Sequence, residues 1–269
     1  MLIGLLRPTR GSIRVAGIDV VARPRRVREA IGYMGQKVSL YQGLTLRENV
    51  QFYAGLHGLE GSALGRRWAA LRERFSLAQA EGSRAEDLPA GLRQRAGLAL
   101  AMLHEPNVLF LDEPTAGLDP AARVRTWDLI AELSGAGADV IVTTHYLAEA
   151  EALADDIVLI HHGRVVAQGA PEILRANHST PGVRIVSAAV FSDDQLRERL
   201  IRDLSHILGI PVGCIVGSHD VVITGGDLVV LRRAIVQWFA TSAVALEGLA
   251  DAEADLEEVF FALTTSDTP

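Results

Sequence analysis

The feature that most constrains this chain is the run from Val108 to Thr115. Its four large apolar residues, Val108 to Leu111, predict a strand buried on both faces, which is typical of a central strand in a parallel sheet. Asp112 and Glu113 follow at the carboxyl end of the strand, where open α/β sheets bind their ligands. One carboxylate helps to hold a Mg²⁺ ion that substrate phosphates also bind, so the other is free to accept a proton from water. Taken alone, the pair is better explained as an acidic turn, and the neighbouring segments decide the interpretation.

These neighbouring segments occur in a definite order. They are a strand, Ile31–Met34, followed by Gln36; an apolar helix opened by Leu88–Arg95; the loop Ala116–Pro120; and a second predicted buried strand, Val140–Thr144, followed by His145. With the run Leu-Asp-Glu-Pro-Thr-Ala-Gly-Leu-Asp-Pro, this order resembles the nucleotide-binding subunit of ATP-binding cassette (ABC) transporters. The resemblance extends from Met1 to about Gln168, and it is specific because a long run and its neighbours all occur in sequence.

The resemblance implies an α/β fold class. Residues 1–170 are expected to form a parallel-sheet core of the P-loop NTPase (RecA-like) type, with a helical subdomain at about 44–105 that begins at a Thr45–Glu48 capping box. Residues 171–269 are expected to form a small α+β accessory domain. Tyr41, Leu44 and Phe52 are interpreted either as the lining of a groove that docks the membrane subunit or as ordinary core, and the sequence leaves both open.

Composition agrees with this class. The chain has 269 residues, of which 49% are hydrophobic, so it can form one large core and a smaller one. Charged residues interrupt every apolar run before it reaches membrane-spanning length, and no signal segment is recognised. The formal net charge of −7 argues against a nucleic-acid partner. Cys214 is the single cysteine, which excludes an intrachain disulfide and suits a reducing cytoplasm.

The resemblance also assigns roles to the residues at the predicted site. ATP and Mg²⁺ are the implied substrate and cofactor. Asp112 is expected to lie against the nucleotide-bound Mg²⁺, and Gln36 is expected to touch that ion and the attacking water. Glu113 is expected to polarise the water, and His145 to contact the γ-phosphate from the end of the second strand.

Two further segments are implied to act across a dimer of such subunits. The signature segment departs from the usual Leu-Ser-Gly-Gly-Gln, because Pro89 replaces the serine and Ala90 replaces the first glycine. Proline suits the first turn of a helix, so the helix still presents backbone N–H groups, but a hydroxyl donor is lost. Arg93 and Arg95 are interpreted either as partial compensation or as surface charge. The residues implied to contact a partner's nucleotide or the dimer interface are Leu88, Pro89, Ala90, Gly91 and Gln94 in the signature segment, and Gly117, Leu118 and Asp119 in the following loop.

The amino-terminal segment departs furthest from the family pattern. Met1–Leu6 is expected to be the end of a helix, because Pro8 stops it. The phosphate-binding sequence Gly-x-x-x-x-Gly-Lys-Ser/Thr occurs nowhere in the chain. We therefore expect Met1 to be an internal or misassigned start. As written, the chain is expected not to bind Mg·ATP at micromolar concentration, and its Val108 strand to have an unpaired edge.

The carboxyl-terminal part predicts a βαββαβ order, which resembles a ferredoxin-like unit. A Ser192–Gln195 capping box is expected to open its first helix. The expected elements are strands at 183–190, 212–216, 221–224 and 244–246 and helices from Ser192 to about Ile207 and from Leu228 to Phe239. Interaction or regulation is its expected role. A last amphipathic helix, Leu256–Leu263, is similar to the closing helix of drug- and polymer-exporting ABC subunits.

Two functions from different classes follow. The first is an ATPase subunit that powers export through a separate membrane permease, on the cytoplasmic face of the membrane, with two subunits closing head to tail on two nucleotides. The second is a non-catalytic or truncated subunit that donates its signature helix to a competent partner's site. An ABC ATPase acting on DNA or ribosomes is a weaker third option, disfavoured by the acidic balance.

Overall fold

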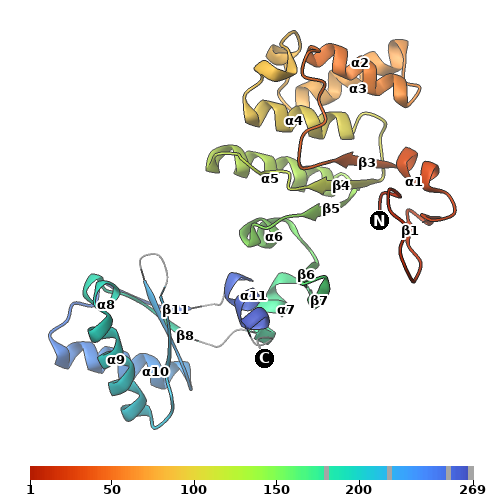
Figure 1. Cartoon of the computed structure of the whole chain (residues 1–269). Coiled ribbons are helices and arrows are strands. Elements are labelled where there is room, and N and C mark those ends of the chain that lie inside the picture. The colour runs from red at the N-terminus through yellow and green to blue at the C-terminus, as the bar shows by residue number, and fades with distance from the viewer. Residues whose placement is uncertain (179–181, 217–219, 253–255, 266–269) are drawn as a thin grey trace. The chain divides into compact units, whose positions relative to one another are not determined.

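The computed structural model describes residues 1–178, 182–216, 220–252 and 256–265 (Figure 1). It divides into two compact units, Met1–Leu153 and Ala154–Pro269. The boundary we predicted, after residue 170, differs from this division. The reason is that β6 (Ile157–His161) and β7 (Arg164–Gly169) pair with each other in a separate hairpin, and α7 (Pro171–His178) packs on β7.

The first unit is built on a parallel sheet in the order β3–β4–β5. The strands are β3 (Ile31–Met34), β4 (Val108–Asp112) and β5 (Asp139–Thr143), and both pairs are parallel. Residues 108–111 of β4 are buried, as the sequence predicts. The parallel α/β core is confirmed.

Two predictions about these strands are wrong. The Val108 strand has no open edge, because β3 and β5 flank it. The second strand, predicted to be buried, alternates between exposed and half-buried residues, and Ile141 is 41% exposed. The reason is position in the sheet: β5 is the outer strand, and within the described residues no strand pairs with its other edge.

Helices surround this sheet. The helices α2 (Leu46–Leu56), α3 (Gly61–Arg74) and α4 (Ala90–Ala101) lie together, and α4 packs on β3 (Figure 1). Two short 3₁₀ turns, Ala78–Ala80 and Ala85–Asp87, join α3 to α4. The helix α5 (Pro120–Gly135) leads from β4 to β5, and α6 (Leu147–Leu153) follows β5.

The predicted start of α2 is confirmed. The Thr45 hydroxyl accepts from the Glu48 N–H, and the Glu48 carboxylate accepts from the Thr45 N–H, so both N–H groups are satisfied. The buried core of this region joins helices and sheet through residues that include Leu46, Trp68, Phe75, Leu98, Leu103, Leu109 and Leu111.

The amino-terminal segment differs from its prediction. Met1–Leu6 forms turns and bends, not the end of a helix. The hairpin β1 (Arg14–Val15) and β2 (Ile18–Asp19) follows, with Ala16 and Gly17 at positive φ in its turn, and then α1 (Pro24–Ala30).

The second unit contains the predicted βαββαβ order. Its antiparallel sheet runs β11–β8–β10–β9, with α9 (Asp194–Leu208) packed against α10 (Leu228–Ser242). The strands are β8 (Gly182–Val186), β9 (Gly213–Val216), β10 (Val221–Thr224) and β11 (Gly248–Ala252). The helix α11 (Leu256–Thr265) packs against α7.

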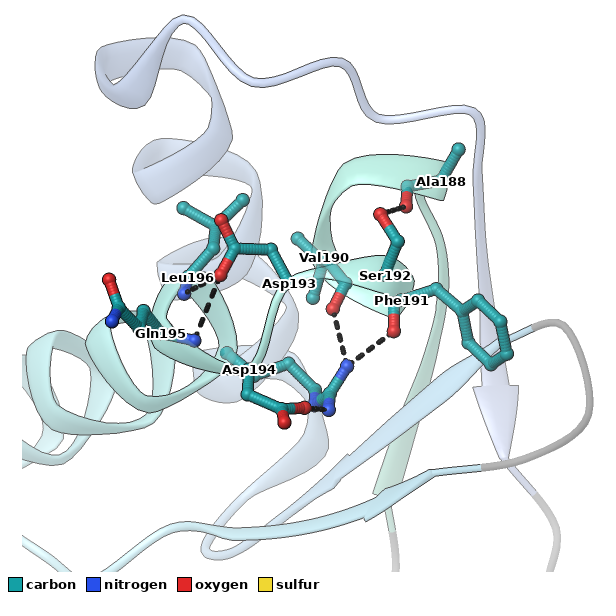
Figure 2. A network of polar contacts seen from close by, with 9 residues as sticks. Ala188, Val190, Phe191, Ser192, Asp193, Asp194, Gln195 and Leu196 are labelled. Carbon is teal, nitrogen blue, oxygen red and sulfur yellow. Dashed lines mark hydrogen bonds and ion pairs between the residues drawn. The ribbon is translucent and has the colours of Figure 1, made fainter.

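Three details of that unit correct the sequence reading. The first strand stops at Val186, and α8 (Ala188–Ser192) follows it. The last strand begins at Gly248, after the predicted segment 244–246. Asp193, not Ser192, caps α9: its carboxylate accepts from the N–H groups of Gln195 and Leu196, while the Ser192 hydroxyl donates to the Ala188 carbonyl (Figure 2). Ser and Asp are both common N-cap residues. Asp193 caps α9 because the Ser192 hydroxyl is already bound to a carbonyl of α8.

No helix among the described residues is both long and apolar enough to cross a membrane.

Candidate functional site

The candidate site lies at the carboxyl ends of β4 and β5. Asp112 is the last residue of β4, and its Oδ1 accepts a hydrogen bond from the Thr143 hydroxyl at the end of β5. Glu113 follows, and its N–H donates to the Thr143 carbonyl at 2.8 Å. Its φ of +49° lies in the left-handed region, which a residue with a Cβ adopts only when its surroundings hold it there.

The Glu113 carboxylate gathers two residues that are distant in sequence. The amide nitrogen of Gln36 donates to Oε2 at 2.9 Å, and Nδ1 of His145 lies 3.2 Å from Oε1. The Glu113 side chain is 24% exposed and that of His145 is 58% exposed. The structure therefore joins Gln36, Glu113 and His145 in one solvent-accessible cluster, beside Asp112. Their chemical roles stay predictions.

The donor set fits a nucleotide-bound Mg²⁺. The Asp112 carboxylate has a second oxygen beyond the one bound to Thr143, and Gln36 keeps its amide oxygen because only its nitrogen binds Glu113. Carboxylate and amide oxygens are ligands that Mg²⁺ prefers. Within the part of the chain that the structure describes, no group of three His, Cys, Asp or Glu residues suits a metal ion by itself. The other ligands would therefore come from phosphate and water.

The signature segment approaches this site within one subunit. Leu88 is buried, Pro89 precedes α4 as its N-cap residue, and Ala90 is the first helical residue. A Cβ built on Gly91 would lie 3.5 Å from the Ala122 Cβ at the start of α5. The signature helix and α5 are therefore neighbours at their amino-terminal ends.

Gln94 is bound within its own subunit. It is 6% exposed, and its amide nitrogen donates to the carbonyl of Pro114, directly after Glu113. This bond links α4 to the loop that contains Glu113. The predicted contact of Gln94 with a partner's nucleotide stays a prediction.

Comparisons with known proteins agree with this geometry. A family model described as ABC transporter matches residues 1–116. The chain is 41% identical over 176 residues to the probable multidrug ABC transporter ATP-binding protein YbhF of Escherichia coli K12, covering 65% of this chain and 30% of YbhF. It is 39% identical over 212 residues to the daunorubicin/doxorubicin resistance ATP-binding protein DrrA of Streptomyces peucetius, covering 79% and 63%.

A solved structure of an ATP-binding subunit of an ABC transporter is also similar. It has a TM-score of 0.58 and 33% identity, with 65% of this chain and 73% of that chain covered. This chain belongs to the ABC transporter family. Its match spans less than two thirds of the length of the curated relatives YbhF and DrrA.

The loop that ABC subunits place after the Asp-Glu pair is well defined here. Gly117 is exposed with a φ of +73°, and Leu118 is 7% exposed. Asp119 is exposed and caps α5, because its carboxylate accepts from the Ala122 N–H at 2.9 Å and Pro120 occupies the first helical position. Its contact across a dimer of ABC subunits stays a prediction.

The two arginines of the signature helix are structural. Arg93 donates to the Leu88 carbonyl at 2.9 Å, and Arg95 donates to the Phe75 carbonyl at 3.1 Å. Burial, and then the nearby charge of Arg125, lowers the pKa of Arg95. Both guanidinium groups bind backbone carbonyls of their own chain, so plain surface charge does not describe them. Compensation for the lost serine stays a prediction.

Burial excludes one of the two alternatives for Tyr41 and Phe52. Tyr41 is 51% exposed and Phe52 is 41% exposed, and their rings meet edge to face at 4.6 Å, so neither is ordinary core. Leu44, which lies between them in the sequence, is half-buried. Buried Asn49 fixes this loop: its Oδ1 accepts from the Tyr41 N–H, and its amide donates to the carbonyls of Tyr41, Leu44 and Thr45.

Sequence reasoning missed Glu149. It is fully buried on α6, and one carboxylate oxygen accepts from the Thr115 hydroxyl at 2.8 Å and from the Trp127 indole N–H at 2.9 Å. The segment from Leu147 to Leu153 contains a second glutamate, Glu151, and only the fold distinguishes the two. The one available signal was the position of Glu149 in the first turn after His145.

Proposed function

We propose that the chain is the ATP-binding and ATP-hydrolysing part of an ABC exporter that powers transport through a separate membrane permease. The observation that carries this proposal is the cluster of Gln36, Glu113 and His145 at the carboxyl end of β4. Export is supported by the names of the relatives, which are a probable multidrug transporter protein and a daunorubicin/doxorubicin resistance protein. The transported substrate is expected to be selected by the permease.

The chemistry assigned to this chain is proton transfer and positioning. Glu113 accepts the proton of the attacking water, which is the work of a general base. Gln36 and His145 orient its two oxygens, and the Thr143 hydroxyl fixes Asp112 beside them. When bound with the nucleotide, Mg²⁺ neutralises the charge that develops on the phosphate oxygens.

The proposed partners are a membrane permease and a second nucleotide-binding subunit, on the cytoplasmic face of the membrane. The exposed aromatic pair of Tyr41 and Phe52 suits contact with the permease, because interfaces are enriched in aromatic residues. The net charge of −7 disfavours nucleic acid. We assign residues 171–269, the predicted accessory domain, a role in interaction or regulation.

The test uses the protein at its full natural length. We expect phosphate release from Mg·ATP that stops in Glu113→Gln while nucleotide binding persists. Nucleotide binding without hydrolysis in the unaltered protein, alone and with its permease, would favour the non-catalytic alternative. Failure to bind nucleotide in any assembly would refute the proposal.

A further inference from the structure

We propose that Glu149 is a positioning residue that holds the Glu113 loop and the His145 segment in register with each other. This inference rests on the proposed function of Glu113 and His145, and it assigns to the same site a third acidic residue that does not touch the reacting atoms.

Glu149 forms a buried junction between neighbouring elements. It has no exposed surface, and its Oε1 accepts hydrogen bonds from Thr115 on the loop after β4 and from Trp127 on α5. Its Oε2 is buried and, within the described residues, has no hydrogen-bond partner. Burying a carboxyl group costs free energy, because the group loses its hydration, unless its hydrogen bonds stabilise the folded structure.

The loop that contains Glu113 is held from several sides. Glu113 has a positive φ, which persists only where neighbouring contacts enforce it. Its own N–H binds the Thr143 carbonyl, the Pro114 carbonyl accepts from Gln94, and the Thr115 hydroxyl donates to Glu149. Consecutive residues of the loop are therefore bound to β5, α4 and α6.

Glu149 also belongs to α6, the helix that follows His145. Its N–H donates to the Tyr146 carbonyl at 3.0 Å, and the Tyr146 ring lies 4.2 Å from the His145 ring. Arg123 of α5 lies over the Tyr146 ring, with its guanidinium carbon 4.4 Å from the ring centroid. A shift of Glu149 therefore moves His145 and Glu113 relative to each other.

The consequence for catalysis is one of geometry. Glu149→Ala leaves two donors, on buried Thr115 and half-buried Trp127, without their acceptor and releases the loop from α6. A misplacement of about 1 Å in a catalytic group, caused by a change away from the chemistry, costs about 10²-fold in rate. Glu149→Gln keeps an amide oxygen at the same place, so both donors retain an acceptor.

The kinetic test compares these variants in the full-length protein. Glu149→Ala is expected to lower kcat by about 10²-fold with the KM for ATP nearly unchanged, and Glu149→Gln to restore most of that rate. Thr115→Val and Trp127→Phe each remove one donor and are expected to lower kcat by smaller factors. Asp128→Asn, an exposed carboxylate beside Trp127 on α5, is the matched control and is expected to leave kcat unchanged.

A second measurement needs no activity. Amide hydrogen exchange across residues 112–116 is expected to accelerate in Glu149→Ala and Thr115→Val, and to stay at the unaltered rate in Asp128→Asn. If the unaltered protein does not hydrolyse ATP, the proposed function fails, yet the exchange result still decides the positioning role. If Glu149→Ala does not fold, Thr115→Val and Trp127→Phe decide it.

The inference is overturned if the exchange of residues 112–116 is the same in all folded variants. It is equally overturned if kcat is unchanged in both Thr115→Val and Trp127→Phe. It is also overturned if Glu149→Gln is as slow as Glu149→Ala, because equal rates would assign the effect to the charge of Glu149.

Discussion

The change Glu113→Gln tests the proposed chemistry most directly, because the structure predicts that it removes the base and leaves its contacts. The Glu113 carboxylate accepts from Gln36 through Oε2 and lies 3.2 Å from Nδ1 of His145 through Oε1. In the variant, the amide oxygen takes the place of Oε2 and still accepts from Gln36. The amide nitrogen faces His145, whose neutral ring accepts at Nδ1 when its proton is on Nε2.

The expected magnitude follows from this retained geometry. Loss of a general base costs about 10²–10⁴ in rate, which is about 2.7–5.4 kcal/mol at 1.36 kcal/mol for each factor of ten. The free energy of unfolding should change by less than about 0.5 kcal/mol, as for a substitution that breaks no buried contact. The rate loss should therefore come from chemistry and not from folding.

The assay is single-turnover phosphate release by the full-length protein at saturating Mg·ATP, with the nucleotide dissociation constant measured in parallel. Asp128→Asn is the matched control, because it makes the same carboxylate-to-amide change at an exposed position on α5, outside the cluster. Turnover by Glu113→Gln at the unaltered rate would remove Glu113 from the mechanism. A loss of nucleotide binding equal to the loss of rate would show that Glu113 acts in binding.

Three other predictions concern packing, pH and assembly. In Gly32→Ala, the added Cβ would overlap the Ala101 carbonyl oxygen and the Leu109 side chain, so thermal unfolding should show a loss of about 1–3 kcal/mol, while Gly65→Ala, at an open helical position, should stabilise slightly. The pKa values of His57 and His104 are lowered, chiefly by burial. The unfolded chain therefore takes up protons first, and the free energy of unfolding should fall as pH drops below the ordinary value of 6.5. In denaturant titrations, the free energy of unfolding of His104→Gln should depend less on pH than that of the unaltered protein. The ATPase rate of the isolated full-length subunit should rise more than linearly with its concentration in the dilute range, and a proportional rate from monomers under ATP would contradict a composite dimer site.

The sequence by itself determined the local elements and the family. The apolar run of β4 is typical of a buried central strand, and the capping box at Thr45 predicts the start of α2. Both signals depend on residues that are close in the chain, so the sequence alone contains them. The resemblance to ABC subunits predicted that the carboxylate, amide and imidazole residues after successive strands share a site, and the structure brings Gln36, Glu113 and His145 together. Local signals failed where two caps competed, at Ser192 and Asp193.

Only the tertiary structure decided burial and partnership. The apolar sequence of β5 predicts a buried strand, yet β5 is an outer strand with exposed and half-buried residues. Strand order is set by pairing between distant segments, which the local sequence does not show. Gln94, Arg93 and Arg95 bind backbone carbonyls that no spacing rule predicts. Glu149 shows the reason most clearly: Thr115 and Trp127 come from other elements, and a carboxylate becomes a buried junction only when the fold brings such donors to it.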